Sequence, residues 1–251
     1  MQPFFLKLTL YMQTPLSSGA AGASSFVADR IAVRNGLGEF IIPGSQVRGN
    51  VRHACERLLR AVGAADRICY GPRPDRMCPH APSASIPAID DPDSPDHTLR
   101  CCILCRLFGS SYFTSPLHFH DLVCRNPFRQ ASQPPYTSQR DARLGDETLR
   151  TMVSLNRQRR VAQERRLFVV ETTPAEPQLA FSHDEAISGT LDTEAQAQLL
   201  LASLNLLTAI GGGRSRGLGW IQSEAEATLD GQPVQLRDGE GLRQLWLSSG
   251  C

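Results

Sequence analysis

The sequence predicts a mixed α+β domain in which two helices are inserted between four strands. Two stretches with helical apolar spacing, residues 45–62 and 193–210, are each followed by glycine. Runs that alternate apolar and polar side chains precede and follow both stretches. The resulting order of strand, helix, strand, strand, helix, strand is that of a ferredoxin-like βαββαβ core, which is also the topology of RNA-recognition domains.

The first strand and the first helix have the clearest patterns. Residues 2–12 alternate as a half-buried strand does. A Gly/Ala/Ser-rich loop at residues 17–25 then leads into a hairpin predicted at residues 26–42. Ser45 is the predicted N-cap of the first helix, and Gly63 is its predicted stop.

Three further strands and one helix complete the predicted core. The predicted strands are residues 117–123, 166–173 and 218–229. Thr193 and Gln196 stand in capping-box positions at the start of the second helix, and Gly211 stops it. We expect a single domain of residues 1–251 with two insertions. Residues 64–116 are irregular and rich in proline and cysteine, and residues 125–165 are polar, arginine-rich and expected to project from the body.

Composition and charge restrict the classes of function. The 26 basic and 25 acidic residues give a net charge of +1, so the chain lacks the strong positive charge of many free-standing nucleic-acid-binding proteins. Lys7 is the only lysine, and arginine favours bidentate and stacking contacts. The start of the sequence has no signal-peptide pattern, and no apolar run has the length of a membrane helix. We therefore expect a cytoplasmic protein with no membrane partner.

The cysteines predict a structural zinc site. In a cytoplasmic protein, eight cysteines indicate metal ligands or core thiols rather than disulfides. Cys102 and Cys105 form a CxxC pair, and four thiolates close a tetrahedral zinc site. The predicted ligands are Cys69, Cys78, Cys102 and Cys105. Cys101 or His80 could replace one of them. The alternative, a set of unrelated buried thiols, is disfavoured because this polar, proline-broken segment lacks a core of its own.

A glycine-rich loop between the second helix and the last strand is the main candidate for ligand binding. Residues 211–220 contain five glycines and two arginines. Glycine allows close approach of the backbone, exposed N–H groups attract anions, and guanidinium groups suit phosphate. The loop matches neither dinucleotide-binding nor Walker motifs, which favours an RNA or DNA backbone. The simpler alternative is a helix C-cap followed by a turn. The predicted contacts are Gly211, Gly212, Gly213, Arg214 and Arg216.

Two arginines of the first helix are also candidate contacts for an anion. Arg48 and Arg52 are four residues apart, so they share one face of the helix. Basic side chains in the first turns of a helix oppose its dipole, which indicates an anionic partner. The alternative is a pair of solvated surface arginines.

Several motifs together resemble the RAMP superfamily of CRISPR-associated proteins. In the family's order, they are Ile42-Pro-Gly-Ser-Gln-Val-Arg-Gly49, Cys102-Ile-Leu-Cys-Arg-Leu-Phe-Gly-Ser110, Asn156-Arg-Gln-Arg-Arg-Val-Ala162 with Leu167, Phe168 and Glu171 after it, and the glycine-rich loop. The resemblance is to the backbone subunits of type III effector complexes. The zinc arm is most similar to those of the III-D and III-E branches. Arg48 stands where the family usually has lysine.

The resemblance implies an antiviral function. Such subunits form a filament with other RAMP subunits along a guide CRISPR RNA, which would be held by the glycine loop, Arg48, Arg52, Arg157 and Arg159. The insertion at residues 125–165 would be a thumb-like hairpin that kinks the guide. In several members a loop aspartate upstream of the Pro-Gly-Ser motif cuts the paired target RNA. Asp29, fourteen residues before Pro43, stands at this position.

The favoured interpretation is a guide-RNA-binding subunit that cuts target RNA as a Mg²⁺-dependent endoribonuclease. One carboxylate can bind Mg²⁺ through waters, although the absence of a second nearby carboxylate argues against a preformed two-metal site. A second interpretation is a non-catalytic scaffold in the same complex, in which Asp29 only caps its loop. A third is a CRISPR RNA-processing ribonuclease with His53 as its base. That enzyme is expected to have two ferredoxin-like halves and no zinc arm.

Overall fold

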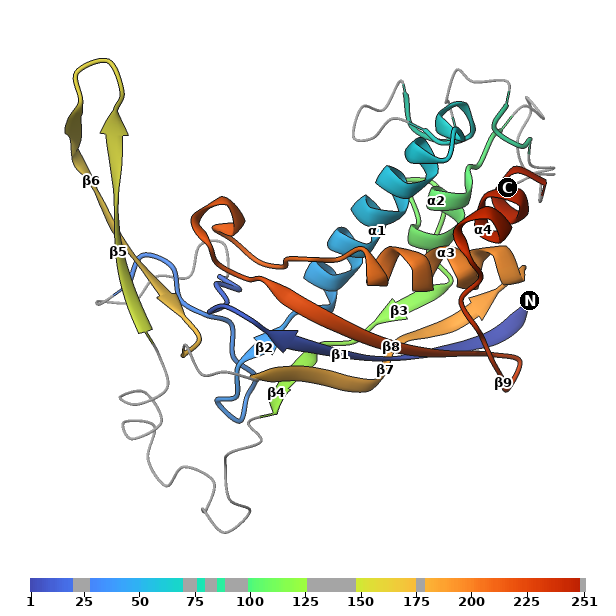
Figure 1. The fold of residues 1–251 in the computed structure, drawn as a ribbon, viewed down its shortest axis with the longest axis horizontal. Helices are drawn as coiled ribbons and strands as arrows, with labels where there is room; N and C mark the ends of the chain where they lie inside the picture. The colour runs from blue at the N-terminus through green and yellow to red at the C-terminus, as the bar shows by residue number, and fades with distance from the viewer. Residues whose placement is uncertain are drawn as a thin grey trace, which may run out of the picture.

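The computed structural model describes residues 1–19, 28–69, 76–79, 85–88, 99–125, 148–174 and 179–248. It has a mainly antiparallel sheet with helices over one face, and a two-stranded hairpin that projects from this body (Figure 1). The predicted α+β class is confirmed. In chain order the helices and strands are β1 (Gln2–Met12), β2 (Ile41–Ile42), α1 (Gly44–Ala61), η1 (Ala65–Arg67), α2 (Ile103–Phe108), β3 (Leu117–Phe119), β4 (Leu122–Arg125), β5 (Thr148–Asn156), β6 (Val161–Thr172), β7 (Ala180–Leu191), α3 (Glu194–Asn205), η3 (Arg214–Arg216), β8 (Ile221–Leu229), β9 (Gln232–Pro233) and α4 (Gly239–Ser248).

The strand β1 lies at the centre of the sheet. The strand order is β2-β4-β7-β1-β8-β9, β3 also pairs with β7, and β1 is antiparallel to both β7 and β8. Alternate side chains of β1 are fully buried, as the pattern of residues 2–12 predicts. They are Phe4, Leu6, Leu8 and Leu10. The helices α1 and α3 lie over one face of this sheet (Figure 1).

The prediction for the third strand of the body is wrong. Residues 166–172 belong to β6, which pairs with β5 in the projecting hairpin. The third body strand is β7, which has no clear period-two pattern because a bulge between Leu6 and Leu8 shifts its register on β1. Gly189 of β7 also has a positive φ of 149°, and a Cβ there would collide with the Pro116 carbonyl oxygen. This close approach explains a glycine inside a strand.

The start of α1 differs from its prediction. Pro43, not Ser45, is the N-cap residue, and its side chain makes no capping hydrogen bond. The N–H of Gly44 instead donates to the Asp121 Oδ1 atom at 2.8 Å. A Cβ at position 44 would collide with the Phe119 carbonyl oxygen, so only glycine lets the helix start this close to the turn after β3. The helix ends at Ala61, and Gly63 follows with φ of +91°, as predicted.

The helix α3 has its predicted start and a shorter end. The Gln196 side-chain oxygen accepts hydrogen bonds from the N–H groups of Asp192 and Thr193, at 2.8 and 3.4 Å, which is one half of the predicted capping box. The helix ends at Asn205 rather than at residue 210. None of the helices in the part of the chain that the structure describes is both long and apolar enough to cross a membrane.

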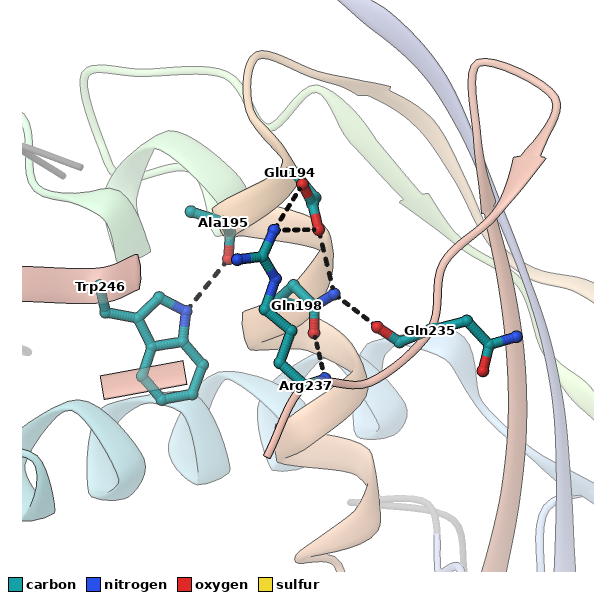
Figure 2. Close-up of polar contacts among 6 residues, drawn as sticks. All are labelled: Glu194, Ala195, Gln198, Gln235, Arg237 and Trp246. Atoms are coloured by element: carbon teal, nitrogen blue, oxygen red, sulfur yellow. Dashed lines mark hydrogen bonds and ion pairs between the residues drawn. The ribbon is translucent and has the colours of Figure 1, made fainter. Parts of the chain in front are cut away.

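A C-terminal segment that the sequence pattern does not predict packs on α3. Arg237 pairs with the Glu194 carboxylate, at 2.9 and 3.0 Å to its two oxygens (Figure 2). The Gln198 side chain donates a hydrogen bond to the Gln235 carbonyl and accepts one from the Arg237 N–H. The Trp246 indole of α4 is buried and donates to the Ala195 carbonyl at 3.2 Å. These contacts hold the C-terminal segment on the first turns of α3 (Figure 2).

Candidate metal centre and nucleic-acid interface

The four cysteines that the sequence singles out lie together and are buried. The Sγ atoms of Cys69, Cys78, Cys102 and Cys105 lie within 4.8 Å of one another. Cys69 lies 3.4 Å from Cys105 and 3.7 Å from Cys102, sulfur to sulfur. Four sulfurs that bind one zinc at about 2.3 Å with tetrahedral angles are about 3.8 Å apart. The sulfur separations therefore fit a metal such as zinc.

Local structure explains how the two arms meet. Cys102 is the N-cap of α2 and Cys105 lies in its first turn, so the CxxC pair presents two sulfurs from one turn. The N–H of Cys102 also donates to the Cys78 sulfur at 3.3 Å. Cys101 is buried but turns away: its thiol donates to the Cys102 carbonyl oxygen, and burial raises its pKa to about 12. Cys101 is not part of the group, and His80 lies outside the described residues.

The electrostatics of the cluster favour a cation. Hydrogen bonds from Cys105, Cys69 and Cys78 lower the pKa of Cys102. The same bonds to Cys102 raise the pKa of Cys78 and of Cys105. The hydrogen bond with Cys102 raises the pKa of Cys69, but those with Cys105 and Cys78 outweigh it and lower this pKa to about 7. Ionisation of Cys102 and Cys69 is thus favoured, whereas ionisation of all four would bring like charges together in a buried site. A divalent cation removes that repulsion and binds the thiolate form of every ligand.

The two arginines of α1 link this cluster to the body. Arg48 donates to the carbonyl oxygen of Phe108. Arg52 donates to the Gly109 carbonyl at 2.9 Å and approaches the Cys105 sulfur at 3.9 Å. Their positive charges lie at the C-terminal end of α2, where the helix dipole is negative. Sequence reasoning did not find this contact, because nothing in the local pattern indicates which helix end the side chains reach.

The glycine loop is a folded turn with two exposed arginines. Gly213 and Gly217, both left-handed, flank η3, and Arg214 and Arg216 are exposed. A Cβ at Gly219 would collide with the Ile210 carbonyl oxygen. Backbone carbonyls already accept from five N–H groups of the loop, those of Gly212, Arg216, Gly217, Leu218 and Gly219. The fixed backbone therefore holds the arginines, and fewer N–H groups remain for an anion than the sequence suggests.

This loop lies between α1 and the projecting hairpin. The Arg214 Nη1 atom lies 3.4 Å from the Asn50 Oδ1 atom of α1. The Arg216 Nη1 atom lies 3.0 Å from the Met152 sulfur of β5. A Cβ at Gly211 would meet the Ser17 carbonyl, so the loop also packs closely on the chain after β1. Three segments that are far apart in sequence thus meet at one surface.

Asp29 is fixed at the base of the hairpin. Its Oδ2 atom accepts a hydrogen bond from the Val169 N–H at 2.7 Å, and its own N–H donates to the Val169 carbonyl at 2.9 Å. The side chain is exposed. Val169 is next to Phe168, which pairs with Met152 in the hairpin. Asp29 therefore lies near the part of the hairpin that the glycine loop contacts.

Glu171 holds the segment that carries Asp29. The Glu171 side chain is largely buried, and its Oε2 atom accepts from the Ala32 N–H at 3.2 Å. The Oε1 atom pairs with Arg34 at 3.1 Å, and the Arg34 guanidinium lies 3.8 Å from the centre of the Phe40 ring. The N–H of Glu171 donates to the Arg30 carbonyl. Glu171 belongs to a sequence motif, but its partners are 137 and 139 residues away and cannot be inferred from spacing.

The tip of the hairpin carries the remaining predicted contacts. The Asn156 Oδ1 atom accepts from the N–H groups of Gln158 and Arg159 and so forms the turn. Arg157 and Arg159 are exposed. The hairpin points away from the helices (Figure 1), so these two arginines are separate from the glycine loop. Residues 126–147 of the predicted insertion lie outside the described residues.

The comparisons agree with this arrangement of motifs. Residues 9–222 match the family model described as the RAMP superfamily. No curated protein matches the sequence at a significant level. The matched region contains the Pro-Gly-Ser start of α1, the cysteine cluster, the hairpin and the glycine loop. The chain therefore belongs to the RAMP superfamily, which makes it a CRISPR-associated, RNA-binding protein.

Proposed function

We propose that the protein is a guide-RNA-binding backbone subunit of a type III CRISPR effector complex. It holds the guide across the glycine loop and cuts complementary target RNA with Asp29. Its partners are the guide CRISPR RNA, the target RNA and other RAMP subunits, in the cytoplasm. The observation that carries the proposal is that the glycine loop meets α1 and β5. Arg214 and Arg216 are exposed there, beside the hairpin to which Asp29 is hydrogen-bonded.

The strand order supports a ferredoxin-like core for this function. The strands β4, β7, β1 and β8 are neighbours in that order, and α1 and α3 connect them across one face. If β3 and β4 together are taken as the second strand, the chain order is βαββαβ. The hairpin of β5 and β6 then lies between the second and third core strands, in the position of a thumb-like insertion.

The charge distribution supports contact with an RNA backbone. The net charge of the chain is only +1, so attraction for RNA must be local. Exposed arginines occur at the glycine loop and at the hairpin tip: Arg214, Arg216, Arg157 and Arg159. Guanidinium groups bind phosphates irrespective of base sequence, as a subunit that accepts any guide requires. Arg48 and Arg52, which already donate to carbonyls of α2, would contact RNA with their remaining N–H donors.

Asp29 is the candidate catalytic residue. In the reaction we propose, a target 2′-hydroxyl attacks the adjacent phosphorus and the P–O5′ bond breaks. The 2′-hydroxyl loses its proton as the O2′–P bond forms, and the leaving O5′ gains one. The products are a 2′,3′-cyclic phosphate and a 5′-hydroxyl. Val169 fixes one carboxylate oxygen of Asp29, so the other can orient the attacking hydroxyl.

The cysteine cluster has a structural role in this proposal. Zinc held by Cys69, Cys78, Cys102 and Cys105 would have four protein ligands and no open position, so it would supply stability rather than a reactive water. The Arg52 contact to Cys105 and Gly109 connects the cluster to α1. The metal therefore supports the helix that borders the glycine loop, through the segment of residues 64–116.

One observation favours the non-catalytic alternative, in which the protein is a scaffold subunit. Within the described ranges, the four cysteines are the one group of three or more metal-binding side chains. Asp29 has no such companions there, so the described residues give no support for a preformed magnesium site at Asp29. In the scaffold alternative Asp29 only joins its loop to β6 through the Val169 hydrogen bonds.

The test is RNA cleavage by the purified complex with matched aspartate variants. Asp29→Asn keeps an oxygen for the Val169 N–H but removes the charge, and Asp29→Ala removes both. Asp230→Asn is the control, because it makes the same charge change at an exposed turn whose positive φ of 51° asparagine tolerates.

We expect short RNA to co-purify with the wild type, which cuts a complementary labelled RNA to 2′,3′-cyclic phosphate ends. Both Asp29 variants should bind target within about threefold of wild type and cut at least about 100-fold more slowly, as expected for loss of a catalytic acid–base group. Binding without cutting by the wild type would favour the scaffold. Protein that never carries or binds RNA would contradict both.

A further inference from the structure

A pocket beside the glycine loop is not used by the function proposed above. It has a volume of about 410 Å³ and lies where the chain leaves α3 and enters β8. Trp220 forms one of its walls, and 45% of the surface of this residue is exposed. The second tryptophan, Trp246, is only 2% exposed and has a hydrogen-bond partner for its indole. Trp220 therefore presents a large aromatic face to solvent.

The backbone holds Trp220 in place. Its N–H donates to the Thr14 hydroxyl at 2.9 Å, and its carbonyl accepts from the Gln13 N–H at 2.8 Å. Gly219 before it has a positive φ of 72° and donates to the Pro15 carbonyl. The next residue, Ile221, donates to the Thr208 carbonyl at 3.0 Å. The exposed ring is thus attached to a rigid backbone, and little order is lost when a ligand stacks on it.

Apart from Leu207 and Ile221, the rest of the lining is polar, and all of it is uncharged. Side-chain amides come from Gln13, Asn205 and Gln222, and Thr208 adds a hydroxyl. Amides offer both donors and acceptors, as do the edges of nucleobases. No charged side chain is among the described residues that line the pocket. The lining therefore disfavours a phosphate or a charged peptide side chain and suits a flat, neutral, heteroaromatic group.

The position of the pocket, next to the proposed RNA-binding loop, indicates the kind of ligand that it binds. Trp220 is four residues after Arg216, at the end of the glycine loop that would hold the RNA backbone. A base that turns away from a backbone bound at Arg214 and Arg216 needs an apolar face on which to stack. Exposed aromatic side chains next to a basic track are the usual means by which proteins bind single-stranded RNA.

We infer that Trp220 and this pocket bind one unpaired nucleobase of the RNA, with Trp220 stacking on the base and the amides contacting its edge. The inference rests on the proposed RNA-binding function and adds a contact to a base. Stacking on an aromatic ring depends little on base identity, so the pocket is compatible with a guide of any sequence.

The test compares two ligands of equal length and charge, a single-stranded RNA oligonucleotide and an abasic oligonucleotide. Trp220→Ala should weaken binding of the base-containing RNA by about 5- to 100-fold, the range that measured base–aromatic stacking predicts. Its affinity for the abasic strand should stay within about twofold. Trp220→Phe should recover most of the lost affinity. RNA should quench tryptophan fluorescence in the wild type and not in Trp220→Phe, in which the buried Trp246 is the remaining tryptophan.

The outcomes separate the inference from the proposed function. If Arg214→Ala with Arg216→Ala weakens RNA binding while Trp220→Ala binds as the wild type does, the inference is wrong and the proposed function stands. Equal losses for base-containing and abasic strands would also overturn it, because they would assign Trp220 to the fold. Intact RNA binding with loss of assembly between chains would identify a protein contact instead. A wild type that binds no RNA would overturn both ideas.

Discussion

The cysteine cluster and the β5–β6 hairpin are opposite kinds of structure in one chain. The cluster is closed: its four cysteines are at most 4% exposed, and the apolar side chains of α2 are also buried. The hairpin is open. Leu149, Val153 and Leu155 alternate along one face of β5 and are 45–63% exposed, and Leu167 opposite them is 67% exposed. One segment encloses four buried thiols that could bind a metal, whereas the other presents side chains outward.

This difference indicates which of the two segments contributes to folding and which to binding. A small segment without a core of its own gains stability from metal binding. A two-stranded hairpin gains little from pairing alone and is ordered where its base packs on the body. Here the base is buried at Val170, Glu171 and Thr172, and exposure increases toward the tip. We therefore expect changes in the cluster to affect folding, and changes near the tip to affect binding.

The largest effect on stability is expected from Cys102→Ser. Loss of one thiolate leaves a three-sulfur site, so bound zinc should fall from about one per chain to well below half. Removal of a structural metal site commonly costs several kcal/mol, and a loss of about 3 kcal/mol would lower the Tm of a chain of this size by about 10 °C. Metal analysis and thermal unfolding measure the two quantities.

Cys124→Ser is the control for this prediction, since Cys124 lies on β4 and is not among the four clustered cysteines. Its metal content and Tm should match those of the wild type. A Cys102→Ser variant with unchanged metal and Tm would show that the cysteines are ordinary buried thiols, which would remove the contrast with the hairpin.

An intermediate effect is expected from Glu171→Gln at the base of the hairpin. The change removes the charge that pairs with Arg34 and weakens the hydrogen bond from the Ala32 N–H. Partly buried, hydrogen-bonded charges typically contribute about 1–3 kcal/mol, which corresponds to a few degrees in Tm. Hydrogen exchange of residues 28–34 should accelerate more than that of β1. Equal protection in both segments would mean that Glu171 does not hold the segment that carries Asp29.

The smallest effect is expected from Leu167→Ser on the open face of the hairpin. This side chain is 67% exposed, so its replacement should change the free energy of unfolding by less than about 0.5 kcal/mol. Thermal unfolding of the isolated chain is the measurement. A drop in Tm as large as that of Cys102→Ser would mean that the hairpin face is packed in solution and is not open.

The sequence predicts best where the pattern is local. Alternation in β1, the capping positions of α3 and the CxxC spacing each depend on residues within a few positions of one another. The alternation is confirmed, one half of the capping box forms, and the CxxC cysteines lie in the predicted group of four. The strand β7 was missed because its bulge against Leu6 and Leu8 interrupts the alternation. The local pattern predicts Ser45 as the cap, because the actual partner of the helix start, Asp121, is 77 residues away.

In the candidate site, too, the local features could be predicted from the sequence and the tertiary ones could not. The cysteines could be grouped from spacing and residue type, and the structure brings the same four together. The role of Glu171, the contacts of Arg48 and Arg52 with the end of α2, and the pocket at Trp220 depend on tertiary packing. No local pattern contains that information. Whether Asp29 is catalytic remains a prediction, since its position by the hairpin fits both cutting and scaffold functions.

The central claim is that RNA lies across the glycine loop, and the salt dependence of RNA binding tests it most directly. The variant is Arg214→Ala with Arg216→Ala. The control is Arg57→Ala with Arg243→Ala, two exposed arginines on α1 and α4 outside this surface. Affinity for single-stranded RNA is measured at several salt concentrations for wild type and both variants.

If each loop arginine contacts one phosphate, the loop variant should bind about 10- to 100-fold more weakly, irrespective of RNA sequence. The slope of log K against log salt should become shallower by about 1.4, which is about 0.7 for each phosphate contact on a single strand. The control should keep both the wild-type affinity and the wild-type slope. An unchanged affinity and slope in the loop variant would contradict the claim and assign RNA binding to another surface.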